Sequence, residues 1–163
     1  MEMRFAPVAR GLLTYVPALN DLLPSKSVGH TDSAAYCYGV WMKHLTLLHA
    51  NGLREMPQTV AELGPGESLG VGICALLSGA SHYVGLDVVA YSNPRRNQRI
   101  LDDLVPLFRD RAANPDKGWP SVSAWLDERL FPSHILTDAA LEQTLPPEGI
   151  EAVGLMAEDR RDV

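Results

Sequence analysis

The chain has 163 residues, which is the size of one domain and enough to enclose a substantial hydrophobic core. Apolar residues make up 46% of the sequence and charged residues 21%, a composition that is ordinary for a globular protein and argues against long disorder. The formal net charge is −6, and the one basic cluster, Arg95, Arg96 and Arg99, is expected to be a solvated helical turn. Nucleic acid is therefore disfavoured as a partner, because phosphate binding requires a basic face, and a small-molecule ligand fits the charge better.

The two cysteines, Cys37 and Cys74, belong neither to a CxxC pair nor to a Cys/His set with zinc spacing, so no metal site is expected. Both lie among apolar residues and are expected to be buried free thiols in a reducing cytoplasm. Met1–Pro17 lacks the continuous apolar run of a signal peptide, and no run in the chain has the length that a bilayer requires. We therefore expect a cytoplasmic protein that does not enter membranes.

An N-terminal helical segment is expected over residues 1–57, beginning with a short amphipathic piece at Val8–Val16. A much stronger helix follows, because the three residues Thr31–Ser33 all suit an N-cap and Asn51-Gly52 is a stop signal. Between these signals, apolar residues recur at helical spacing on one face: Ala34, Tyr38, Trp41, Leu45 and Leu48.

Residues 58–163 are expected to form an incomplete Rossmann-like α/β domain. Thr59–Leu63 is a short apolar run with β-branched residues, which is typical of a buried parallel strand. A tight turn at Gly64–Ser68 leads into a predicted helix over Leu69–Ser78, and His82–Val88 is a second predicted strand. A strand, a helix and a strand with short connections form a βαβ unit, from which parallel sheets are built.

The rest of the chain predicts more helices. One begins at Ser92–Pro94, and Pro106 within it predicts a kink or an early end near Asp102–Val105, because proline cannot donate a backbone hydrogen bond. Three later helical pieces are predicted at Ser121–Leu130, at Ala139–Leu145 with Thr137 or Asp138 as its cap, and in a tail from Ile150.

The turn after the first strand and the acid after the second have the residue types that a nucleoside cofactor requires. Gly64 and Gly66 lack a Cβ and let the backbone approach a ligand closely. The helix start near Ser68 offers backbone N–H groups that favour negative charge. Asp87 follows at about the 20-residue separation found in such folds, and its carboxylate can accept hydrogen bonds from ribose hydroxyls. Together these features predict a nucleoside site at the carboxyl edge of the sheet.

The segment Glu62–Gly66, with the sequence E-L-G-P-G, resembles motif I of class I S-adenosylmethionine-dependent methyltransferases. Tyr83–Asp87 resembles the second strand of that family together with its acid. Thr31–Tyr38, with Trp41 and His44, is similar to the helix that precedes the core in a bacterial subgroup of these enzymes. The resemblance implies a Rossmann-like fold, an S-adenosylmethionine cofactor and transfer of its methyl group to an acceptor that the sequence does not identify.

The resemblance also implies a role for each residue of the turn. Gly64, Pro65 and Gly66 pass beside the methionine part of the cofactor, and Ser68 takes the third small position of the motif. Glu62 orients the turn and accepts a hydrogen bond from the cofactor amino group, directly or through water.

Beyond the turn, the resemblance implies that Asp87 holds the ribose and that Val88 packs on the adenine. Ser33 and Tyr36 are expected to close over the methionine end. No catalytic residue is identified.

Two other functions are considered. A dinucleotide fingerprint requires a small residue where this chain has Leu69, which disfavours NAD. A complete methyltransferase core has seven strands and needs about 200 residues, whereas Thr59–Val163 provides for two clear strands and at most a third. A non-catalytic nucleoside-binding or interaction module is therefore the alternative function. An incomplete parallel sheet leaves an edge and apolar faces open, so we expect self-association or a partner chain.

Overall fold

The computed structural model describes residues 31–88, 92–113 and 131–158, so the helices predicted at Val8–Val16 and Ser121–Leu130 lie outside the described residues. The described part is a mixed α/β fold of five helices and a two-stranded parallel sheet, which is compatible with an incomplete Rossmann-like fold. Its elements are, in chain order, α3 (Ala34–Ala50), β1 (Thr59–Leu63), α4 (Gly70–Leu77), β2 (His82–Leu86), α5 (Pro94–Arg109), α6 (Asp138–Thr144) and α7 (Pro147–Glu158). None of the described helices is long and apolar enough to cross a membrane.

Helix α3 begins and ends where its capping signals predict. The Ser33 hydroxyl accepts a hydrogen bond from the Tyr36 backbone N–H at 3.4 Å, and Asn51 caps the other end. Four of the five residues predicted for the buried face are buried, but Leu48 in the last turn is 45% exposed. The helix prediction is confirmed, and the predicted extent of its apolar face is one turn too long.

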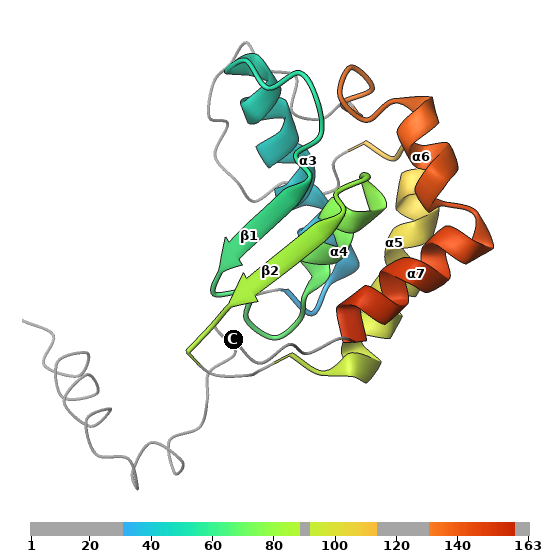
Figure 1. Ribbon diagram of the computed structural model, residues 1–163. Coiled ribbons are helices and arrows are strands. Elements are labelled where there is room, and N and C mark those ends of the chain that lie inside the picture. Colours follow the sequence, from blue (N-terminus) through green and yellow to red (C-terminus); the bar gives the residue numbers. More distant parts are fainter. Residues whose placement is uncertain (1–30, 89–91, 114–130, 159–163) are drawn as a thin grey trace, which may run out of the picture.

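The predicted βαβ unit is confirmed. β1 and β2 pair in parallel, with Thr59 opposite His82 and Leu63 opposite Leu86. α4 connects them and packs on one face of the pair, so that Figure 1 shows the strands in front and α4 behind them. β2 ends at Leu86, two residues before its predicted end at Val88, so Asp87 follows the strand instead of lying within it.

The core lies on the helical side of the sheet, where α3 and α5 pack on α4. The ring of Tyr38 from α3 meets Phe108 of α5 edge-on, with their centroids 5.3 Å apart, and the Tyr38 hydroxyl donates to the Ala112 carbonyl at 2.7 Å. Trp41 donates its indole N–H to the Ser78 hydroxyl, also at 2.7 Å. The helix that precedes β1 thus shares one core with the helices that follow it.

Helix α5 continues through Pro106 to Arg109, so an early end near Asp102–Val105 is wrong, and the kink that was the other expectation there stays a prediction. A proline at this position leaves the carbonyl of Asp102 without its helical donor, but Asp102 is exposed and water can supply that bond. The last turn is held instead by the buried side chains of Val105 and Phe108. Burial of the apolar face therefore outweighs the local preference of proline.

Helices α6 and α7 cover the outer side of the helical layer. Thr137, rather than Asp138, caps α6, and its hydroxyl accepts from the Ala140 N–H at 3.3 Å. Asp138 is the first residue of the helix and pairs with Arg111 of the α5–α6 connection. α7 begins at Pro147, somewhat before the predicted start at Ile150, because proline suits a first helical turn.

The opposite face of the sheet is uncovered by the residues that the structure describes. The side chains that alternate toward α4, from Val60, Glu62 and Tyr83, are half-buried. The side chains on the other face are exposed, and Leu63 reaches 83% exposure. They are Thr59, Ala61, Leu63, His82, Val84 and Leu86, and we call this set the bare sheet face.

Candidate functional site

The turn after β1 requires glycine at two positions. Gly64 and Gly66 have φ angles of +70° and +76°, in the left-handed region that residues with a side chain rarely adopt. A Cβ on Gly66 would also lie 3.1 Å from the Thr31 hydroxyl oxygen. The Gly64 N–H donates to the Leu86 carbonyl at 2.7 Å, which extends the pairing of the strands into the turn. The turn is therefore fixed against both β2 and the residues that precede α3.

Asp87 lies beside this turn, as the sequence predicts. Its Oδ2 accepts a hydrogen bond from the Gly66 N–H at 3.3 Å. The strands are parallel neighbours, so their carboxyl ends meet at one edge and bring the acid and the glycines together. Asp87 is exposed at this edge and Val88 is 99% exposed, so both side chains are accessible to a ligand.

At the start of α4, three backbone N–H groups already have acceptors within the chain. The acceptors are Thr31 Oγ1 for Glu67 at 3.1 Å, Asn97 Oδ1 for Leu69 at 3.1 Å, and Ser68 Oγ for Gly70 at 3.1 Å. A donor that is already bonded inside the protein is a poor anion ligand. The predicted offer of N–H groups to a ligand is therefore reduced by these three donors.

Ser68 and Pro65 lie beneath the turn rather than at its surface. Ser68 is 1% exposed, and its hydroxyl donates to the Thr31 carbonyl while it accepts from Gly70. Pro65 is buried as well. In this arrangement both residues shape the turn, and Gly64, Gly66 and Asp87 present the accessible atoms.

Glu62 has one hydrogen-bond donor among the residues described. The Tyr83 hydroxyl donates to Glu62 Oε2 at 2.7 Å, on the side of the sheet that α4 covers. Burial raises the pKa of the Glu62 carboxyl, and the hydrogen bond from Tyr83 lowers that pKa again. Burial and the adjacent carboxylate raise the pKa of Tyr83, so its proton stays on the phenol and is donated. The carboxylate is thus half-buried, ionisable and oriented by a neighbour.

Two residues of α5 hold the turn in place, and sequence reasoning did not assign them this role. Arg96, expected to be solvated, is half-buried and donates to the Glu67 carbonyl at 2.8 Å, with the Glu67 carboxylate 3.7 Å away. Asn97 is buried and accepts from Leu69 at the start of α4. Their only sequence signal is a position in the first turn of the helix that follows the acid.

The residues expected to close over the methionine end lie at the start of α3. The Ser33 hydroxyl is used as the N-cap, and Tyr36 is half-buried. Thr31, which precedes them, makes the contacts to the turn through its hydroxyl and its carbonyl. The beginning of α3 therefore reaches the predicted site, but through Thr31.

Both cysteines are buried free thiols, as predicted. Burial raises the pKa of Cys37 to about 12 and also raises that of Cys74, so neither is a ready nucleophile. No group of three or more metal-ligating side chains occurs in the described ranges.

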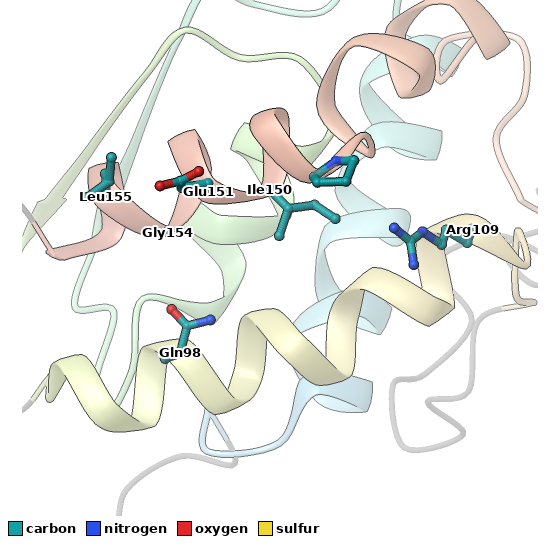
Figure 2. A pocket seen from close by; sticks show the side chains of 7 residues that line it. Gln98, Arg109, Ile150, Glu151, Gly154 and Leu155 are labelled. Carbon is teal, nitrogen blue, oxygen red and sulfur yellow. The ribbon is translucent and has the colours of Figure 1, made fainter.

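A groove of about 490 Å³ lies between α5 and α7, on elements other than those that form the turn. Figure 2 shows Ile150 directed from α7 toward α5, with Gln98 and Arg109 on α5. This groove does not include the predicted residues, and we regard it as a separate feature.

The edge thus combines an accessible carboxylate beside a glycine turn, a second carboxylate behind that turn, and an exposed apolar side chain. These groups can bind hydroxyls, a cationic amine and a flat apolar ring. Comparisons with protein-family models, with curated proteins and with solved structures found no match for this chain.

Proposed function

We propose that this chain binds S-adenosylmethionine at the carboxyl edge of β1 and β2, as the cofactor-binding part of a class I methyltransferase. The observation that carries the proposal is the contact between Gly66 and Asp87, in which the N–H of the turn meets the carboxylate at 3.3 Å. A carboxylate at this position can accept hydrogen bonds from both ribose hydroxyls of a nucleoside that lies along the turn. The proposal extends the observed α/β fold to the methyltransferase type of Rossmann-like sheet.

The bonded N–H groups beside the turn favour a nucleoside without phosphate over a dinucleotide. A pyrophosphate needs free N–H groups at a helix start, whereas Glu67, Leu69 and Gly70 donate to the protein itself. S-adenosylmethionine carries no phosphate and therefore does not need free N–H groups at a helix start. This geometry and the size of Leu69 both count against NAD.

The other groups at the edge match the remaining parts of the cofactor. Glu62 lies behind the turn with a carboxylate that can accept from the protonated amino group of the methionine part. Val88 is exposed next to Asp87 and can pack on the adenine. The methyl acceptor is not identified by these residues.

A non-catalytic nucleoside-binding module is the second candidate, and the bare sheet face favours it. Methyl transfer is an in-line displacement that requires an acceptor held against the sulfonium in a water-poor site. Among the described residues, those that cover the site all lie on the side of the sheet that faces α4. Methyl transfer to any acceptor would support the enzyme, and binding of S-adenosylhomocysteine without turnover would support the module.

We further propose that a second copy of the chain covers the bare sheet face. This face has no carboxylate, lysine or arginine, and His82 is its one titratable residue. Two chains that each carry a net charge of −6 can therefore meet here without bringing like charges together. Self-association would remove exposed apolar groups such as Leu63 from water.

Calorimetric titration with S-adenosylhomocysteine tests the function. Asp87→Ala is expected to weaken binding by about 1.5–3 kcal/mol, roughly 10- to 150-fold, because hydrogen bonds from ribose to a charged group are lost. Asp103→Ala on α5 removes another exposed carboxylate, away from the turn, and should leave the affinity unchanged. The proposal would be contradicted if the unaltered chain did not bind S-adenosylhomocysteine, or if the Asp87→Ala variant bound it with the same affinity. Tighter binding of NAD than of S-adenosylhomocysteine would also contradict it.

A further inference from the structure

Tyr83 lies in a slot that two glycines create between β2 and α4. A Cβ on Gly72 of α4 would lie 2.3 Å from the Tyr83 ring, closer than any real contact. A Cβ on Gly85 would lie 3.1 Å from the Tyr83 hydroxyl oxygen. The ring therefore occupies space that side chains at these two positions would fill.

The slot directs the phenol toward the edge of the sheet that carries the glycine turn. Tyr83 pairs with Val60 in the ladder, whereas its hydroxyl reaches Glu62, which is opposite Gly85. The side chain thus extends along the sheet by the length of two residues, over Gly85, before it donates to Oε2. A phenol held in this way can position the carboxylate and leave Oε1 for another donor.

We propose that Tyr83 is a positioning residue of the cofactor site, whose hydroxyl fixes the Glu62 carboxylate so that it binds the protonated amine of the ligand. The inference rests on the proposed function for the identity of the ligand. The contact between Tyr83 and Glu62 does not depend on it.

The hydrogen bond from the Tyr83 phenol is important for keeping the Glu62 carboxyl ionised. The titratable groups that face the carboxylate are the Tyr83 phenol of β2, the Cys37 thiol of α3 and the Cys74 thiol of α4. Burial keeps both thiols neutral, so neither adds a negative charge beside the carboxylate. Burial favours the protonated acid, and the phenol is the neighbour that favours the anion. Without the phenol, the carboxylate should take up a proton at a higher pH and lose its attraction for an amine.

The first test needs no ligand. The titration of the Glu62 side-chain carboxyl carbon is followed by NMR in the unaltered chain, in Tyr83→Phe and in Tyr38→Phe. Tyr38 is a matched control, because its hydroxyl also donates one hydrogen bond of 2.7 Å, but to the Ala112 carbonyl instead of Glu62. The pKa of Glu62 should rise in Tyr83→Phe alone. An unchanged pKa in that variant, or the same rise in both variants, would overturn the inference.

The second test is calorimetric binding of S-adenosylhomocysteine by the same three proteins between pH 5 and pH 8. Tyr83→Phe should bind about 5- to 10-fold more weakly at pH 7. As the pH is lowered from 8 to 5, its affinity should start to fall at a higher pH than the affinity of the unaltered chain does. Tyr38→Phe should match the unaltered chain at every pH. If Tyr83→Phe binds as tightly as the unaltered chain with the same pH profile, the positioning role is wrong. If the unaltered chain itself does not bind, the proposed function fails, and the NMR titration alone decides the role of Tyr83.

Discussion

Gly72→Ala is expected to destabilise the fold, although alanine is the better helix former. The new Cβ would lie 2.3 Å from the Tyr83 ring, and the ring cannot move freely, because its hydroxyl is bonded to Glu62. Overpacking of this kind costs about 1–3 kcal/mol, whereas the gain in helix propensity is at most about 1 kcal/mol. We expect a net loss of about 1–2 kcal/mol in the free energy of unfolding.

Gly154→Ala in α7 is the matched control. Its Cβ would meet Leu101 Cδ2 at 3.4 Å, which is ordinary contact, so the helix propensity should act alone and stabilise by up to about 1 kcal/mol. Urea unfolding at pH 7, followed by circular dichroism, gives both free energies. The reasoning is refuted if Gly72→Ala proves as stable as Gly154→Ala.

Three further predictions concern the bare sheet face, the proline in α5 and the thiols. Leu63→Glu should shift the chain toward the monomer in sedimentation velocity, whereas Leu155→Glu, at an exposed apolar position of α7, should not; equal effects of the two would argue against association through this face. Pro106→Ala should raise the free energy of unfolding by about 1–3 kcal/mol in urea, because it restores a helical donor at an exposed position; an unchanged midpoint would contradict the account of α5. Because burial raises the pKa of Cys37 to about 12 and also raises that of Cys74, the reactive thiolate is scarce at pH 8. Neither should therefore react with a disulfide reagent in the folded chain, and both should react in urea; rapid labelling of the folded chain would be the contrary result.

The βαβ unit could be predicted from the sequence because its signals are local. The short apolar run at Thr59–Leu63, the glycines of the turn and the period of the following helix all specify the same structure. The relation of Asp87 to Gly66 also follows from these signals, since parallel neighbours place their carboxyl ends together. The acid and the turn were therefore predictable without any tertiary contact.

The residues that hold the glycine turn in place were not predictable, because they are distant from the turn in the chain. Thr31 and Asn97 accept from the start of α4 across 36 and 28 residues, and nothing in their local sequence distinguishes them from other capping residues. Tyr83 has the alternating position of any strand residue, and its slot depends on a glycine in α4. The continuation of α5 past Pro106 likewise depends on the burial of Phe108, which is a tertiary effect.

The most direct test of the cofactor site is to map S-adenosylhomocysteine by NMR on the backbone amides of the whole chain. Saturating ligand is predicted to shift the amide signals of Gly64, Gly66 and Asp87, and to leave those of Ile150 and Gly154 in the groove between α5 and α7 unchanged. Shifts confined to that groove, or no shifts at saturating concentration, would contradict a cofactor site at the carboxyl edge of the sheet.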